Sequence, residues 1–151
     1  MQLAGKLVHV EHMRMRWADM DALGHMNNTV YLRCLEQARI SWFDRLGVDY
    51  SARTEGPVLG SVRCRFRIPA VYPADLAISL YADRPRNSSF VLRSAITDEK
   101  EPQRVYATGE AVMVWIDLTD GKSRPLPQWL RQSWSGEECQ RRAAGRRRAL
   151  N

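Results

Sequence analysis

The stretch that decides the fold covers residues 16–39, which read RWADMDALGHMNNTVYLRCLEQAR. Its first half is polar and rich in turn-forming residues, whereas from Val30 onward the apolar residues fall at the spacing of an α-helix. This pattern continues as far as Gly47, a residue suited to end a helix, and Asn27 or Asn28 can cap its start. The sequence therefore predicts one long helix. Because apolar positions surround most of that helix, a sheet or a partner must cover it.

Alternation of apolar and polar residues predicts strands on both sides of the helix. Before it, Met13, Met15 and Trp17 alternate with arginines, which indicates a strand that begins near Leu7 and turns these three side chains to the core. Four further strand patterns follow the helix, within residues 58–68, 76–80, 90–96 and 104–118. One helix with consecutive strands is typical of an α+β fold with an antiparallel sheet, because parallel strands need crossover helices between them.

Length and composition indicate a single globular domain. The chain has 151 residues, of which 44% are hydrophobic and 26% are charged, and a domain of this size can bury a core without a disulfide or a metal. No apolar run approaches the roughly 20 residues of a membrane helix, and the first residues lack the pattern of a secretory signal. Cys34, Cys64 and Cys139 are odd in number and widely spaced, so neither a disulfide framework nor a zinc site is expected. These features favour a cytoplasmic protein with reduced cysteines.

The net charge of +6 is concentrated near the end of the chain. Five arginines lie between Arg141 and Arg148, and subtracting them from +6 leaves the rest of the chain near +1. We therefore predict a domain over residues 1–135, with a short helix that starts at Trp129, and a flexible basic tail over residues 136–151. A nucleic-acid partner is not expected, since no aromatic residues interleave with these arginines. Contact of the tail with phosphates is the alternative.

Polar residues gather in the loop just before the predicted helix. At a helix N-terminus, unpaired backbone N–H groups and the helix dipole favour an oxyanion or a developing negative charge. Asp21 adds a carboxylate, and His25 adds an imidazole that can transfer or hold a proton. The composition alone also fits an ordinary turn-forming loop. The residues concerned are Asp19, Asp21, Gly24, His25, Asn27 and Asn28.

This loop and helix resemble the opening motif of the hotdog-fold acyl-CoA thioesterases of the 4-hydroxybenzoyl-CoA thioesterase type. In that family a strand, a D-x-D-x-x-G-H/I-x-N-N loop and a long central helix follow in this order. The likeness extends to the segments GSVRCRFRIPAVYPADL, NSSF and GEAVMVWID and covers about residues 10–130. It implies a hotdog fold, in which an antiparallel five-stranded sheet wraps around one long central helix. It also implies hydrolysis of acyl-CoA thioesters to a carboxylic acid and coenzyme A.

The resemblance places the catalytic carboxylate on Asp21, as a general base toward water or as a nucleophile toward the thioester carbonyl. A backbone N–H near Asn28 would polarise the carbonyl oxygen. His25 is expected to orient substrate or water, or else to make a structural hydrogen bond. Asn27 and Tyr31 are candidate substrate contacts, with helix capping and core packing as the alternatives. An ordinary aspartate, with a pKa of about 3.9, is ionised at neutral pH, so both roles of Asp21 stay open.

Other titratable residues near this motif have different expected roles. Asp19 is expected to shape the loop. Glu36, in the helix, is expected to pair with Arg39 or to lie at an interface, although another hotdog branch uses a helix glutamate for catalysis. His9 and His12 lie on opposite faces of the first strand without further ligands nearby, so no metal site is expected.

Coenzyme A is expected as part of the substrate, and no cofactor is required. The resemblance implies active sites between two subunits of a homodimer or homotetramer, with coenzyme A lying over basic residues. The sequence lacks the motifs of serine hydrolases, dinucleotide-binding enzymes and P-loop proteins. The alternatives are a hotdog dehydratase or hydratase that uses His25 and an acid, and a non-catalytic module that binds acyl-CoA or nucleic acid. Candidate contacts to coenzyme A, unless they form only a solvated face, are Arg63, Arg65, Arg67, Arg86, Asn87, Ser88 and Ser89.

Overall fold

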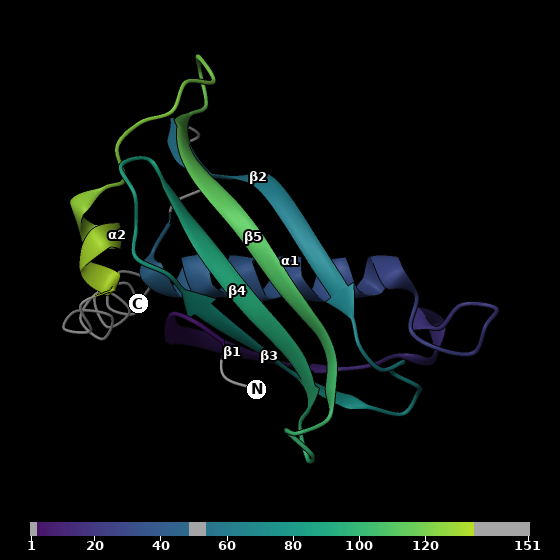
Figure 1. Ribbon diagram of the computed structural model, residues 1–151. Helices are drawn as coiled ribbons and strands as arrows, with labels where there is room; N and C mark the ends of the chain where they lie inside the picture. Colours follow the sequence, from purple (N-terminus) through teal and green to yellow (C-terminus); the bar gives the residue numbers. More distant parts are fainter. Residues whose placement is uncertain (1–2, 49–53, 135–151) are drawn as a thin grey trace, which may run out of the picture.

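The computed structural model describes residues 3–48 and 54–134. Its elements are β1 (Lys6–Arg14), the 3-10 helix η1 (Trp17–Asp19), α1 (Asn28–Leu46), β2 (Glu55–Phe66), β3 (Asp75–Ala82), β4 (Ser89–Asp98), β5 (Val105–Asp117) and α2 (Gln128–Ser133). The five strands form one antiparallel sheet in the order β1-β3-β4-β5-β2, so β1 and β2 are its edges. Figure 1 shows the long helix α1 crossing one face of this sheet. The predicted α+β architecture is confirmed.

Local chemistry fixes both ends of α1. The Oδ1 atom of Asn27 accepts a hydrogen bond from the N–H of Thr29 at 2.9 Å, which makes Asn27, and not Asn28, the N-cap. At the other end Gly47 has a φ of 78°, a left-handed conformation that costs glycine little, and its N–H donates to the carbonyl of Asp44. The predicted end of the helix is therefore confirmed, and the two candidate caps are resolved in favour of Asn27.

The core lies between α1 and the sheet. Gly109 in β5 allows the helix to come close, because a Cβ atom added there would lie 2.7 Å from Cδ1 of Leu35 and 2.5 Å from Oγ of Ser94. Strands β3 and β4 contribute alternate residues to the same side, as the pleat requires. Removal of this apolar surface from water is the main stabilising contribution to the fold. The core includes Tyr31, Cys34, Leu35, Ala38, Trp42, Phe43, Leu46, Leu76, Ile78, Leu80, Phe90, Leu92 and Ile96.

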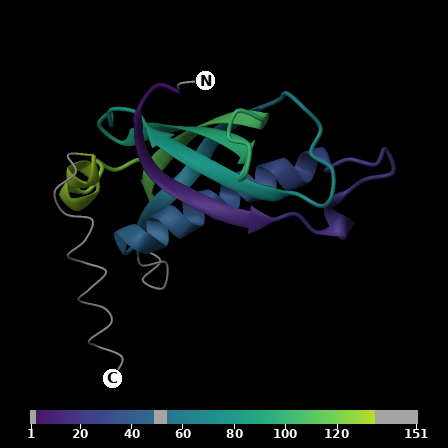
Figure 2. The same cartoon turned by 90° about the horizontal axis from the view of Figure 1, so that it is seen from below.

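Strand β2 is less well covered than the rest of the sheet. Figure 2 shows α1 running obliquely across the sheet. Val62 and Phe66 lie on the helix side, because they oppose the buried Ala111 and Ala107 of β5, yet they remain 40% and 50% exposed. On α1, Leu32 is 40% exposed. The alternation predicted for this strand is present, but part of its apolar face is open.

Trp17 contradicts the predicted inward orientation. Its side chain is 73% exposed, whereas that of Met15 is 2% exposed. Strand β1 ends at Arg14, and the chain then turns into η1, where the Asp19 carboxylate accepts hydrogen bonds from the backbone N–H and from Nη2 of Arg16, at 2.8 and 2.7 Å. The alternation of the strand therefore stops before Trp17, and the prediction for this residue was wrong.

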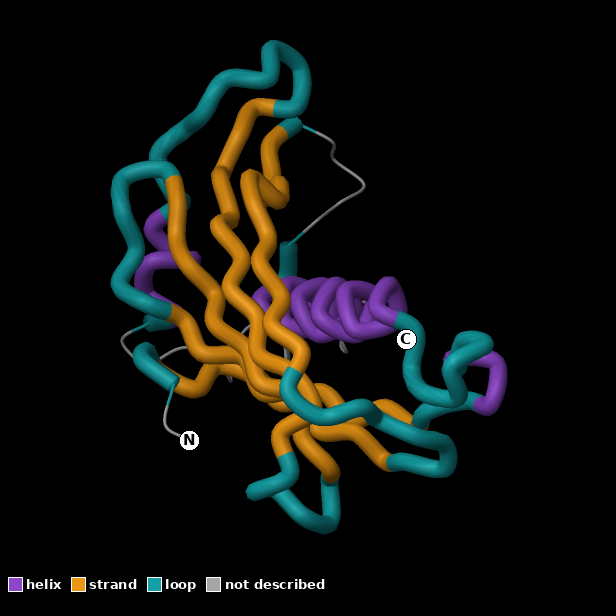
Figure 3. The backbone as a smooth tube through the Cα atoms, turned by 45° about the vertical axis from the view of Figure 1, so that its right-hand side comes forward, coloured by secondary structure: helices purple, strands orange, loops and turns teal. Residues whose placement is uncertain are grey.

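A short helix follows the sheet, as predicted. Helix α2 places Leu130 in the core, and the ring of Trp134 just beyond it meets the rings of Trp42 and Phe90 edge-on, with centroids 6.0 and 5.2 Å apart. Figure 3 shows α1 beside the curved sheet, with α2 at the opposite end from the loop that precedes α1. The predicted continuation of the C-terminal helix and the arginine tail lie outside the described residues.

Candidate active site

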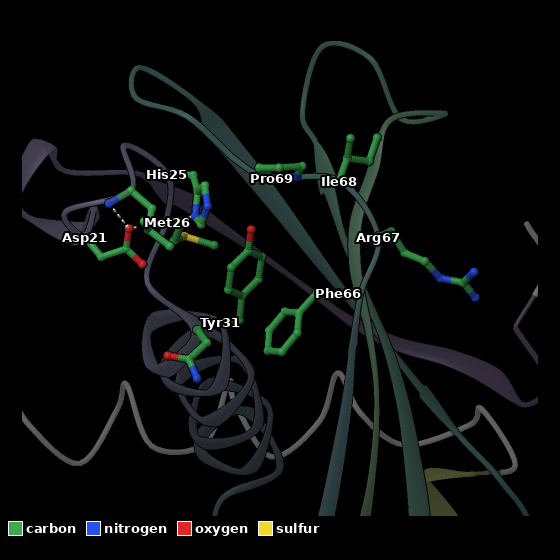
Figure 4. Close-up of a pocket in the computed structure, with 10 residues that line it drawn as sticks. Asp21, His25, Met26, Tyr31, Phe66, Arg67, Ile68 and Pro69 are labelled. Atoms are coloured by element: carbon green, nitrogen blue, oxygen red, sulfur yellow. Dashed lines mark hydrogen bonds and ion pairs between the residues drawn. The ribbon is translucent and has the colours of Figure 1, made fainter.

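Backbone hydrogen bonds hold the loop before α1 in one shape. Within it, Met20 and Met26 form a β-bridge, and the N–H of Asn27 donates to the carbonyl of Asp19 at 2.9 Å. The N–H of Met26 also donates to the carbonyl of Ala70, beyond the end of β2, at 2.8 Å. This contact brings the loop and the end of β2 together, as Figure 4 shows, and the candidate site lies between them.

Asp21 lies in this loop with one oxygen engaged. Its Oδ1 atom accepts a hydrogen bond from the N–H of Leu23 at 2.8 Å and lies 3.9 Å from Nδ1 of His25. Its Oδ2 atom makes no hydrogen bond with any residue that the structure describes. The side chain is 25% exposed. The backbone thus orients the carboxylate while one oxygen can still reach water or a substrate.

The first N–H group of α1 lies beside the same site. Among the described residues, nothing accepts a hydrogen bond from the N–H of Asn28, as is usual in the first turn of a helix. The N–H groups of Thr29 and Val30, by contrast, donate to the side chain and the carbonyl of Asn27. The positive end of the helix dipole makes the electrostatic potential at this point more positive. The N–H of Asn28 is therefore the donor available to a carbonyl oxygen.

A cavity of about 530 Å³ opens next to these groups. One of its walls is the ring of Phe66, which meets the ring of Tyr31 edge-on with 5.1 Å between the centroids. The Tyr31 hydroxyl accepts a hydrogen bond from the N–H of Ala70 at 3.1 Å, so its own proton is available to a ligand. Burial raises the pKa of Tyr31, which keeps this hydroxyl protonated. The lining residues are Asp21, Leu23, His25, Met26, Asn28, Tyr31, Phe66, Arg67, Ile68 and Pro69.

The structure brings five of the predicted site residues together around this cavity, namely Asp21, His25, Asn28, Tyr31 and Arg67. Asn27 is not among the lining residues, because its Oδ1 atom accepts from both the N–H and the hydroxyl of Thr29 and so caps the helix. The apolar wall formed by Met26, Phe66, Ile68 and Pro69 is not predicted by the sequence patterns. The one signal for it was Pro69, which ends a strand pattern.

The residues predicted to contact coenzyme A lie elsewhere in the chain, with the exception of Arg67. Figure 4 shows the Arg67 side chain directed away from Asp21. Arg63 and Arg65 alternate with Cys64, which opposes Gly109 on the helix side, so both arginines lie on the other face of the sheet. The turn containing Arg86, Asn87, Ser88 and Ser89 is at the far end of the sheet, where Nη2 of Arg131 donates to the carbonyls of Arg86 and Asn87. Within one chain these two groups do not reach the cavity.

Two further carboxylates differ in their surroundings. Asp19 is 7% exposed and closes the loop, as predicted, and its hydrogen bonds from Arg16 lower its pKa. The expected ion pair between Glu36 and Arg39 is not formed in the described part of the chain, where Glu36 is exposed and Arg39 is only 8% exposed. The interface interpretation of Glu36 therefore stays a prediction.

Residues 3–48 and 54–134 contain neither a cluster of metal-ligating side chains nor a membrane-spanning helix. No three His, Cys, Asp or Glu side chains of this part are grouped so as to hold a metal ion. No helix there is sufficiently long and apolar to cross a membrane.

Comparison with known proteins places the chain in a family. The chain belongs to the thioesterase-like superfamily, which its residues 15–133 match. It is similar to the PA2801 protein of Pseudomonas aeruginosa, a proposed thioesterase, with 38% identity and a TM-score of 0.81 over 85% of this chain and 98% of that one. A proposed acyl-CoA thioesterase from Xanthomonas campestris is 33% identical, with a TM-score of 0.69 over 80% of this chain and all of that one (100%).

More distant relatives share the same architecture. Slr0204 of Synechocystis, a 1,4-dihydroxy-2-naphthoyl-CoA thioesterase, is 20% identical and has a TM-score of 0.77 over 85% of this chain and 96% of that one. The expected hotdog fold, a five-stranded antiparallel sheet around one long helix, is confirmed. Membership of the superfamily supports thioester hydrolysis as the activity.

Proposed function

We propose that this protein hydrolyses acyl-CoA thioesters and releases a carboxylic acid and coenzyme A. The observation that carries the proposal is the position of the Asp21 carboxylate and the Asn28 N–H beside one apolar cavity, in a chain of the thioesterase-like superfamily. Apolar walls with a few polar groups suit an acyl chain whose reacting end needs fixed orientation. The similarity to a proposed acyl-CoA thioesterase supports coenzyme A as the carrier.

The reaction starts when the thioester carbonyl oxygen accepts a hydrogen bond from the N–H of Asn28. This donor and the helix dipole stabilise the negative charge that develops on the oxygen. As a general base, Asp21 takes a proton from water while the water oxygen bonds to the carbonyl carbon. The C–S bond then breaks, and coenzyme A leaves as a thiolate that takes up a proton. The acid and the free thiol are the products.

As a nucleophile, Asp21 would instead bond to the carbonyl carbon itself. The thiolate leaves, and water hydrolyses the resulting anhydride to the acid and the regenerated carboxylate. Both routes use the Asp21 oxygen that the backbone leaves free, and neither needs a metal or a redox cofactor. His25, 3.9 Å from the carboxylate, orients the water or the substrate, and the Tyr31 hydroxyl donates to the bound thioester.

We propose further that the protein acts as a homodimer or as a dimer of such dimers. β2 is an edge strand, and Leu32, Leu59 and Val62 line an open groove between it and α1. Arg39 is nearly buried in this groove and forms no ion pair with a described residue. A negative charge on the second copy would offset the cost of burying the Arg39 charge. In a two-fold dimer both copies use the same surface to contact each other. Glu36 of one copy can then meet Arg39 of the other.

In an oligomer, basic residues of one subunit can also contact coenzyme A bound to another. We propose that Arg67 contacts coenzyme A bound in its own chain. Arg63, Arg65 and residues 86–89 lie away from their own cavity, so in this proposal they contact coenzyme A bound to a neighbouring subunit. Cys34 and Cys64 are free thiols, which agrees with the cytoplasmic location that we propose.

Release of free thiol by the purified protein tests the proposed function. The substrates are acyl-CoAs with short, long and aromatic acyl groups, and the same acyl groups on acyl carrier protein test the choice of carrier. We expect thiol release that is lost in Asp21→Asn. Water addition to an enoyl-CoA without thiol release would reveal a hydratase, and tight acyl-CoA binding without turnover would reveal a non-catalytic module. Either result would overturn the proposal.

A further inference from the structure

A second cavity, of about 370 Å³, lies on the other flank of the loop, between the end of β1 and α1. Burial raises the pKa of the Cys34 thiol in this cavity to about 11, so the thiol is uncharged at neutral pH. The other floor residues are apolar. The floor consists of Met13, Met15, Met26, Val30, Cys34 and Leu76.

The rim of this cavity is basic. Arg14 and Arg16 have side chains that are 79% and 75% exposed. Arg33, on α1, is exposed and forms no ion pair with a residue that the structure describes, and it lies between this cavity and the groove proposed for the second copy. Asp19 is the one acidic residue among the described lining residues, and Nη2 of Arg16 already engages its carboxylate at 2.7 Å. Nε of Arg14 lies 3.8 Å from Oδ1 of Asp75, so among the described rim arginines the charge of Arg33 is the one that remains uncompensated above the apolar floor.

The second cavity is distinct from the one beside Asp21, but the two share a wall. Met26 is 2% exposed and lines both cavities. A methionine side chain is unbranched and adapts readily to its neighbours. An occupant of the second cavity therefore contacts the side chain that bounds the first.

We propose that the second cavity binds an anionic amphiphile, a saturated chain of medium length that ends in a carboxylate. The apolar floor removes the chain from water, and the guanidinium group of Arg33 binds the carboxylate by charge-assisted hydrogen bonds. The volume of the cavity is at the low end of the range for small-molecule sites, which suits such a ligand. The inference rests on the proposed function only for the source of the ligand, because a fatty acid is a product of acyl-CoA hydrolysis.

Titration calorimetry with decanoate tests this site. Wild-type protein and Asp21→Asn should both bind decanoate, whereas decylamine, with the same chain and the opposite charge, should not bind. Arg33→Ala should weaken decanoate binding at least tenfold, and Val30→Phe should abolish it by filling the cavity from the helix. The matched control is Arg84→Ala, which removes an exposed arginine at the far end of the sheet and should bind as the wild type does.

Three results would overturn the proposal. Unchanged affinity in folded Arg33→Ala and Val30→Phe variants would assign decanoate to the cavity beside Asp21. Failure of the wild type to bind decanoate would leave the site without its ligand. Preferential, Arg33-dependent binding of 3′,5′-ADP would assign the rim to the phosphates of coenzyme A. Thiol release, measured in parallel, separates the two proposals: binding without hydrolysis refutes only the proposed function, and hydrolysis without Arg33-dependent binding refutes only this inference.

Discussion

The substitution Asp21→Asn removes the charge of the proposed catalytic group and little else. Asparagine has the same shape, and its Oδ1 atom can still accept the 2.8 Å hydrogen bond from the N–H of Leu23. The neutral amide can neither take a proton from water nor attack a carbonyl carbon, so both proposed roles are lost. We expect kcat/KM to fall by about 10² to 10⁴, which corresponds to about 2.7–5.4 kcal/mol of transition-state stabilisation.

Thiol release gives kcat/KM, and urea denaturation gives the free energy of unfolding. The latter should change by less than about 0.5 kcal/mol, because the side chain is partly exposed and its local hydrogen bond is kept. Asp120→Asn is the control for activity, since Oδ1 of Asp120 accepts from the N–H of Lys122 at the same 2.8 Å while its Oδ2 pairs with Arg124, and it should retain full activity. Wild-type turnover in a stably folded Asp21→Asn protein would refute the assignment. An equal loss in Asp19→Asn would mean that the two aspartates had been assigned the wrong roles.

Other changes test separate parts of the molecule. Tyr31→Phe leaves the buried N–H of Ala70 without its acceptor, so urea denaturation should show a loss of about 1–3 kcal/mol. The pKa of Asp19 is lowered in the folded state, so its ion pair stabilises the fold above the unfolded pKa and this contribution is lost as the pH falls through the folded pKa. Asp19→Asn should therefore lower the melting temperature at pH 7 and lessen its decline below about pH 4. Val62→Asp should convert a dimer to a monomer in light scattering. Truncation after Gly136 should leave kcat/KM unchanged, and a tenfold rise in KM would assign the tail to the site.

Features with local causes could be predicted from the sequence. The start and end of α1 depend on Asn27 and Gly47, which act within a few residues of their own positions. The last strand follows from the alternation of its own side chains, and the predicted residues 104–118 differ from the observed Val105–Asp117 by one at each end. The loop with Asp21 can be singled out from the sequence as a candidate site because its polar residues form one continuous motif.

Features that depend on distant contacts could not be predicted in the same way. The alternation of β1 continues to Trp17 in the sequence, but its partner strand β3 begins only at Asp75, so the pairing of β1 ends at Arg14 and the chain turns into η1. Phe66 forms a wall of the cavity because the backbone hydrogen bond from Met26 to Ala70 brings together two segments that are far apart in the chain. Alternation alone also does not say which face of β2 meets the helix, and only the register with β5 shows that Arg63 and Arg65 lie on the other face.

The exposure of β2 couples the proposed dimer to the proposed activity. Phe66 is 50% exposed and lines the cavity beside Asp21, and it ends the strand whose Val62 lies in the groove proposed for the second copy. A copy that covers this strand also removes water from the cavity, and a drier cavity strengthens the hydrogen bond from the Asn28 N–H to the developing oxyanion. Val62→Asp should therefore lower kcat/KM without touching Asp21, and the activity should recover at high protein concentration as mass action restores the dimer. Ser61→Asp, on the opposite face of β2, is the control and should show neither effect. Full activity in a monomeric Val62→Asp protein would mean that one chain holds a complete site.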